Sequence, residues 1–419
     1  MADFRIEKKK TDGRRGSSSA SLEDYLDYSL FIDAHWKEIC AIADARSADG
    51  FSHTPREMLQ QPWIWQESGR LVVDRMGDLS SLVSGTAQIC LTGAGSSWYV
   101  GESVRSFLER ELKRPVVTVP TTDLILEPTA FLKPETRSLV VSFSRSGRSP
   151  ESFEVARIVS EKFPEHRQLL VTCNPDSELA RKYAKTPGAC TLGLHPSACD
   201  QGLAMTSSFT TMVLAGQALG FLDRPTDYLA HVSESATIGT KLLAASIRAA
   251  ASVDIAQFGR VCILGDGALK GAVLEGALKI LEMTDGQIPT LSESFLGVRH
   301  GPLSFVDSDT LVIFSVSSHS IKRRYEADLI QTLREKGLGK HHVIVGREMS
   351  GQDALYGEAI DLACFSSYAV PDELRPPLDV LVPQVLALRF ALALGLDPDN
   401  PSRRGAISRV VDGVKIYGM

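Results

Sequence analysis

Four serines occur within eight residues, directly after an apolar run that predicts a buried strand. The run 139–141 leads into Ser142, Ser144, Ser146 and Ser149, and Gly147 lies between the last two. Short hydroxyl side chains and the backbone N–H groups at the start of a helix bind phosphate well, and the helix dipole favours its negative charge. The pair Ser149-Pro150 is typical of a helix N-terminus. The segment therefore predicts a phosphate site at a strand-to-helix turn.

A second turn of the same kind precedes it in the chain. Ser96 and Ser97 follow the apolar run 89–91 and the glycines Gly93 and Gly95. A single serine at a strand end is most often only a helix cap, but two neighbouring serine-rich tips favour a shared anion site. The third glycine of a dinucleotide fingerprint and a Walker loop are both missing, so the turn does not indicate NAD or ATP chemistry.

Three charged residues lie at helical spacing inside an otherwise apolar segment. Glu275, Lys279 and Glu282 stand at positions i, i+4 and i+7, so a helix places them on one face. One interpretation is a solvated face with a Glu–Lys pair that contributes a few tenths of a kcal/mol. The other interpretation is a carboxylate that lines a cleft.

A histidine follows in a glycine-containing loop. His300 lies between Gly297 and Gly301, 18 residues after Glu282 in the chain. A lone histidine is more often structural, but a loop imidazole near a helix carboxylate suits aldose–ketose chemistry. The imidazole can move the ring-opening proton, while the carboxylate shuttles a proton between adjacent carbons.

The elements that position these residues follow one plan. Apolar strands alternate with helix-like stretches, which predicts parallel sheets covered on both faces. Gly265-Asp266-Gly267 aligns with Gly93-Ala94-Gly95, so the second half repeats the first. We predict an α/β protein with two doubly wound, flavodoxin-like lobes. The expected parts are a disordered basic tail (1–22), a helical segment (23–85), a first lobe (86–222), a helical linker (223–250), a second lobe (251–397) and a C-terminal tail (398–419).

Composition narrows the classes of function. The chain has 419 residues and a formal net charge of −6, which argues against a general nucleic-acid binder. Seven cysteines without a CxxC pair favour reduced thiols in the cytoplasm and no metal site. The longest apolar stretch, 382–396, contains Arg389 and is predicted to be a buried helix rather than a membrane span.

These motifs together resemble one family. The two Gly/Ser turns, the segment 201–208, the segment 274–279 and Arg299-His300-Gly301-Pro302 are similar to the sugar isomerase (SIS) superfamily. Within it the chain looks most like the galactosamine-6-phosphate deaminase/isomerases, also called tagatose-6-phosphate ketose/aldose isomerases. The match runs from about residue 60 to the C-terminus.

The resemblance implies a reaction and a set of site residues. The implied reaction converts an amino-sugar 6-phosphate, expected to be D-galactosamine 6-phosphate, to D-tagatose 6-phosphate and ammonia, without metal or organic cofactor. By similarity to the isomerase domain of glucosamine-6-phosphate synthase, Glu282 falls on the proton-shuttling carboxylate and His300 on the ring-opening imidazole. The positions similar to substrate- and phosphate-binding ones are Ser96, Ser97, Ser144, Arg145, Ser146, Ser149, Thr206 and Arg409. Such sites commonly lie at a homodimer interface, so we expect a cytoplasmic homodimer or higher oligomer with shared sites and no membrane or nucleic-acid partner.

One departure bears on the mechanism. The synthase forms an imine through a C-terminal lysine, where this chain has Arg409, and a guanidinium does not act as that nucleophile. Arg409 is therefore expected to serve at most as a charge partner, which suits a substrate that brings its own amine. Three alternatives stay open: a plain aldose–ketose isomerase, a fructosamine-phosphate deglycase and a non-catalytic sugar-phosphate sensor.

Overall fold

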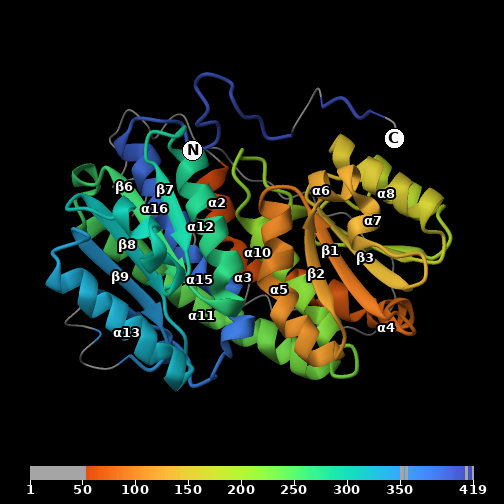
Figure 1. Cartoon of the computed structure of the whole chain (residues 1–419), viewed down its shortest axis with the longest axis horizontal. Coiled ribbons are helices and arrows are strands. Elements are labelled where there is room, and N and C mark those ends of the chain that lie inside the picture. The colour runs from red at the N-terminus through yellow and green to blue at the C-terminus, as the bar shows by residue number, and fades with distance from the viewer. Residues whose placement is uncertain (1–52, 350–352, 354–356, 411–413, 418–419) are drawn as a thin grey trace, which may run out of the picture.

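The chain folds into two α/β lobes that lie side by side (Figure 1). The computed structural model describes residues 53–349, 353, 357–410 and 414–417. The expected basic tail (1–22) and the start of the expected helical segment therefore lie outside the described residues. Within the described part of that segment, three helices cover its second half: α2 (Thr54–Leu59), α3 (Gln61–Val73) and α4 (Met76–Val83).

The first lobe is built on a five-stranded parallel sheet in the order β2-β1-β3-β4-β5. Its strands are β1 (Gln88–Gly93), β2 (Val116–Pro120), β3 (Ser138–Ser144), β4 (Arg167–Thr172) and β5 (Ala189–Gly193). Its helices are α5 (Ser96–Leu112), α6 (Thr121–Leu126), α7 (Pro128–Phe131), α8 (Pro150–Lys162), α9 (Glu178–Tyr183) and α10 (Ser207–Gln217). The short 3₁₀ turns η1 (Pro196–Ala198) and η2 (Ala218–Gly220) flank α10.

The second lobe repeats this topology in the order β7-β6-β8-β9-β10, again with all strands parallel. Its strands are β6 (Arg260–Gly265), β7 (Thr290–Glu293), β8 (Thr310–Ser315), β9 (His341–Gly346) and β10 (Glu358–Asp361). Its helices are α12 (Lys270–Met283), α13 (Ser320–Glu335), α15 (Pro376–Asp379) and α16 (Leu381–Ala393), and its 3₁₀ turns include η4 (Gly267–Leu269), η5 (Gly297–His300), η6 (Pro302–Phe305) and η8 (Asp372–Leu374). The predicted α/β fold with two doubly wound lobes is confirmed.

Each lobe places one face of its sheet in a core that the two lobes share. Alternate residues of a strand point to opposite faces. In β1, Ile89 and Leu91 belong to the large shared core together with α3, α5 and α10, whereas Cys90 packs on the opposite face against α6 and α8. In β6, Val261 and Ile263 join the same shared core, and Cys262 packs against α13. The lobes are thus held together by continuous apolar packing.

One long helix crosses between the lobes. The residues expected to link them belong to α11 (Pro225–Ser252), which packs against α3 on one side and α16 on the other. The segment Pro376–Ala393 is long and apolar enough to span a membrane, but 89% of it is buried inside the protein. The predicted buried helix within 382–396 is confirmed as α16, whose apolar residues join the shared core.

Candidate active site

A cavity of about 480 Å³ opens where β1 and β3 end and the two lobes meet. The carboxyl ends of parallel strands at the point where strand order reverses are where ligands bind in such sheets, and β1 and β3 lie at that point here. The lining comes from α5, the turn after β3, the start of α8, α12 and the C-terminal segment: Ala94, Gly95, Ser96, Ser97, Phe143, Ser144, Arg145, Ser146, Ser149, Glu151, Ser152, Leu203, Met205, Glu282, Gly405, Ala406, Ile407, Ser408, Arg409 and Val410.

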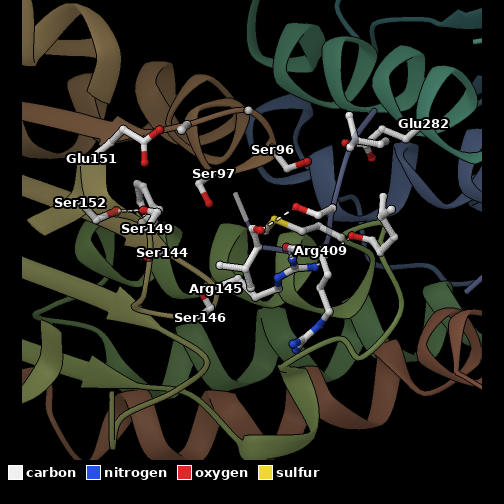
Figure 2. Close-up of a pocket in the computed structure, with 18 of the residues that line it drawn as sticks. Ser96, Ser97, Ser144, Arg145, Ser146, Ser149, Glu151, Ser152, Glu282 and Arg409 are labelled. Carbon is white, nitrogen blue, oxygen red and sulfur yellow. Dashed lines mark hydrogen bonds between the residues drawn. The ribbon is translucent and has the colours of Figure 1, made fainter. Parts of the chain in front are cut away.

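The turn between β3 and α8 forms one end of this cavity (Figure 2). Ser149 is the N-cap residue of α8, as predicted, and its hydroxyl lies 2.7 Å from that of Ser152. The amide of Asn174 donates to the backbone oxygen of Ser146 over 3.1 Å, which fixes the turn against the end of β4. Gly147 has φ of 61°, a left-handed conformation that glycine adopts without strain. The turn therefore presents hydroxyls from a fixed backbone.

The start of α5 forms the adjoining wall. Ser96 and Ser97 are the first residues of this helix and are buried, and Gly95 before them has φ of 55°. The Ser97 N–H donates to the backbone oxygen of Ala94 over 3.1 Å, so this wall offers an anion its serine hydroxyls and the positive end of the helix dipole. Figure 2 shows Ser97 facing the serines of the β3 turn, with Ser96 between them and α12. The two serine-rich tips converge on one cavity, as the sequence predicts.

The charged stripe of α12 forms the opposite end, and it is not a solvated face. Glu275 and Lys279 are fully buried, and the Lys279 ammonium lies 3.1 Å from Glu275 and 2.5 Å from Glu282. Lys279 also donates to the hydroxyl of Ser96 over 3.1 Å. Glu282 keeps 22% of its side chain exposed and lines the cavity. The cleft interpretation is thus the one the geometry supports.

Burial and pairing act on these charges in opposite ways. Burial raises the pKa of Glu275 to about 7, although Lys279 and the hydroxyl of Ser96 act to lower it. Burial by itself would lower the pKa of Lys279, but the two carboxylates outweigh it and raise that pKa above its ordinary value. Lys279 therefore stays protonated at neutral pH. Its charge fixes Glu282 at the cavity wall.

Two arginines tie the floor of the cavity together. Arg145 donates to the backbone oxygen of Leu203 over 3.2 Å and also to that of Arg409. Arg409 in turn donates through Nε to the backbone oxygen of Asp200 over 2.7 Å. Both arginines line the cavity, as their predicted roles require, but their guanidinium groups bond backbone oxygens and, in Arg409, also the sulfur of Cys199 at 3.7 Å. They anchor the C-terminal segment against the first lobe.

Two residues predicted for the site do not line this cavity. Thr206 is fully buried behind the wall, where its hydroxyl donates to the Asp200 carboxylate over 3.2 Å and its N–H donates over 2.9 Å. Its polar groups are taken up by Asp200, which also accepts the N–H groups of Ser207 and Ser208 at the start of α10. His300 is exposed at the end of η5. The structure of one chain thus brings Glu282 and the serines together without His300.

Sequence reasoning missed other lining residues. Arg409 is a predicted site residue, but the rest of the segment Gly405–Val410 was expected only as part of a C-terminal tail, and it covers the cavity floor as well. Glu151 and Ser152 in the first turn of α8 line the cavity as well, and so do Leu203 and Met205. The Ser-Pro-Glu-Ser start of α8 was the available signal for the first pair. No local pattern marks the C-terminal segment, because its position depends on contacts more than 200 residues away in the chain.

The fold and the cavity define a two-lobed α/β protein of the SIS type. Residues 82–221, which hold both serine-rich turns, match the SIS domain model. The chain is 37% identical over 379 residues to a Streptomyces coelicolor protein provisionally named D-galactosamine-6-phosphate deaminase AgaS, which covers 88% of this chain and 97% of that protein. It is 31% identical over 376 residues to the Escherichia coli D-galactosamine-6-phosphate deaminase AgaS, covering 87% and 95%.

A solved structure agrees with these relatives. The crystal structure of tagatose-6-phosphate ketose/aldose isomerase from Escherichia coli superimposes with a TM-score of 0.79 at 30% identity, covering 89% of this chain and 98% of that one. The chain belongs to the SIS domain family, and within it to the group of the AgaS proteins.

Proposed function

We propose that this chain is an enzyme that converts D-galactosamine 6-phosphate and water to D-tagatose 6-phosphate and ammonia. The observation that carries the proposal is the position of Glu282, which faces the cavity opposite the serine-rich turns and is held there by Lys279 (Figure 2). The names of the AgaS relatives support this substrate. The cytoplasm is the compartment in which we place the reaction.

The serine-rich turns are assigned the phosphate. Ser144, Ser146 and Ser149 offer hydroxyls from one turn, and Ser96 and Ser97 add hydroxyls from the start of α5. With the 6-phosphate held there, the sugar carbons extend toward Glu282. Arg145 and Arg409 add positive charge at the floor, although their bonds to backbone oxygens assign them mainly to anchoring the C-terminal segment.

Glu282 is assigned the proton transfer between C1 and C2 of the open-chain sugar. Its carboxylate takes the proton from C2 while the substrate ammonium gives a proton to the C1 carbonyl oxygen, which yields an enaminol. The carboxylic acid then returns its proton to C1, which leaves an iminium at C2. Water then adds to C2, the C2–N bond breaks, and ammonia leaves as the C2 carbonyl forms. Lys279 acts as a positioning residue, because it is buried and contacts both Glu282 and Ser96.

His300 is assigned the ring-opening proton transfer in a neighbouring subunit. It is exposed on the surface of its own chain and does not line its own chain's cavity, so a homodimer with shared sites is the arrangement that we propose. Leu281 next to Glu282 and Leu296 in the loop before His300 are 40% and 48% exposed. Exposed leucines on both surfaces suit a subunit contact there.

Purified protein should release ammonia and tagatose 6-phosphate from galactosamine 6-phosphate. Glu282→Gln should lower kcat by about 10³-fold while sugar-phosphate binding persists, because the carboxamide keeps the size but cannot accept the proton. Glu109→Gln, on the outer part of α5, is the matched control and should retain full activity. Ammonia assay and product chromatography also separate deamination from plain isomerisation. Absence of turnover on every hexosamine 6-phosphate would contradict the proposal.

A further inference from the structure

The second lobe contains a counterpart of the phosphate turn. When Gly93 is aligned to Gly265, Thr92 in β1 corresponds to Leu264 in β6. Thr92 pairs with Ser142 of β3 and Leu264 pairs with Phe314 of β8, so Ser142 and Phe314 are equivalent positions. Seven residues (143–149) then precede α8, whereas five residues (315–319) precede α13. The second turn is two residues shorter but again carries serines, at positions 315, 317 and 318.

The counterpart turn already holds a carboxylate. Ser318 donates its N–H to Oδ1 of Asp372 over 2.9 Å, and the hydroxyl of Ser317 donates to Oδ2. Arg375, which is fully buried, donates to Oδ1 over 3.2 Å. Burial opposes the charged form of Asp372, but Arg375 and the serine donors outweigh it and hold its pKa below the ordinary value. Asp372 is therefore ionised in this position.

The remaining donors of the turn are used as well. Ser317 donates its N–H to both oxygens of the buried Glu326 carboxylate, over 3.1 and 3.0 Å. Arg375 also donates to the backbone oxygen of Val316 over 2.8 Å and forms a second ion pair with Asp379 at 2.7 Å. The turn thus has the donor set of an oxyanion site, and carboxylates of the chain itself satisfy it.

The helix facing this turn, α5, carries an arginine at the position where α12 carries Glu282. Gly95 and Gly267 are equivalent and have φ of 55° and 59°, so Arg110 in α5 stands where Glu282 stands in α12. Arg110 pairs at 2.5 Å with Glu373, the residue after Asp372. This pair holds η8 against α5, with Asp372 directed into the turn.

We propose that the turn after β8 is a second oxyanion site that Asp372 occupies from within the chain. Each chain therefore binds one sugar phosphate, in the first lobe only. Removal of the Asp372 carboxylate frees the three donors that bond to it, which are the Ser317 hydroxyl, the Ser318 N–H and one N–H of Arg375. A free tetrahedral oxyanion can then bind to them, while Arg375 stays in place through Val316 and Asp379. The proposal concerns anion binding alone and holds whatever reaction the first lobe catalyses.

Inorganic phosphate is the probe. Thermal unfolding of wild type, Asp372→Ala and the control Asp78→Ala, which removes an exposed aspartate on α4, is compared in phosphate and in chloride of equal ionic strength. The first-lobe site is common to all three proteins, so its effect cancels. Asp372→Ala should be destabilised in chloride and should gain about 2 °C more from phosphate than Asp78→Ala gains. Equal gains in the two variants would overturn the proposal.

A measurement on first-lobe variants covers the case in which Asp372→Ala does not fold. In the wild-type chain, phosphate binding measured by equilibrium dialysis should saturate at one phosphate per chain. Ser144→Ala combined with Ser146→Ala should abolish it, because Asp372 still fills the second turn. A second equivalent of phosphate in wild type, or binding that survives in the double variant, would show that the second turn is open and would refute the proposal.

Discussion

At the scale of single residues, the site depends on one buried cation. Lys279 is fully buried between Glu275 and Glu282 and also reaches Ser96, so it connects α12 to the first turn of α5. A buried ammonium costs desolvation free energy, which the two carboxylates offset only while the geometry persists. Lys279 therefore contributes both to the packing of α12 against α5 and to the position of the Glu282 carboxylate in the cavity.

Lys279→Met should accordingly lower the free energy of unfolding by about 3–5 kcal/mol, because it leaves two carboxylates close together without a cation. It should also lower kcat, since Glu282 loses the contact that orients it. Urea denaturation measures the first effect and an ammonia-release assay the second. Adding Glu275→Leu should restore part of the stability but not the activity. An unchanged urea midpoint in the single variant would exclude this role for Lys279.

At the scale of elements, α2 supports the loop behind the cavity. Glu57 accepts the N–H groups of Gln201 and Gly202, just before Leu203 in the cavity wall. Burial, together with the nearby Asp200, raises the pKa of Glu57 to about 8. At neutral pH the Glu57 carboxyl group of α2 is therefore protonated. It lies near a second acidic group, Asp200, in the loop that it supports.

The raised pKa predicts how stability depends on pH. Between the ordinary pKa near 4.5 and about 8, the folded protein binds more protons at Glu57 than the unfolded chain does. This contribution to stability is complete below the lower value and is lost as pH rises through the upper one. Wild type should lose about 5 kcal/mol across this range through Glu57, because each pKa unit corresponds to about 1.4 kcal/mol.

Glu57→Gln should flatten that dependence, because an amide does not titrate. Glu67→Gln in α3 is the matched control, since Glu67 sits in a surface pair with Arg70, and it should follow wild type. Unfolding midpoints measured at several pH values for the three proteins test this. If wild type and Glu57→Gln lose stability in parallel as pH rises, ionisation of Glu57 is not the cause.

At the scale of the whole molecule, one chain holds only part of the proposed machinery. Glu282 and the serine-rich turns share a cavity, while His300 lies on an exposed 3₁₀ turn. A closed dimer with two-fold symmetry can supply each cavity with the imidazole of the other subunit. The proposed dimer therefore predicts complementation between two inactive variants.

Mixing equal amounts of unfolded Glu282→Gln and His300→Ala chains and refolding them together should restore about one quarter of wild-type activity. Half of the random dimers are then mixed, and each mixed dimer has one intact site. Each variant refolded alone is the control. If His300 acted in its own chain, no mixed dimer would have an intact site, and activity would stay at the level of the controls.

The sequence by itself determined the architecture and much of the cavity. Continuous apolar runs followed by Gly/Ser turns predict parallel strands, because a strand that is covered on both faces is apolar on both. The repeat of Gly93-Ala94-Gly95 at Gly265-Asp266-Gly267 predicts two similar lobes, and both sheets have the same strand order. The serines at both tips line one cavity, since adjacent parallel strands end at the same edge.

Tertiary structure decided what local spacing leaves open. Helical spacing places Glu275, Lys279 and Glu282 on one face but does not say what covers it, and the contact with α5 buries the first two. Thr206 lies beside two serines in the sequence, yet its hydroxyl and its N–H both donate to the Asp200 carboxylate instead of facing the cavity. Contacts of Arg409 with Arg145 and Asp200 hold the C-terminal segment at the cavity. Such contacts join residues far apart in the chain, so they form only when both lobes have folded.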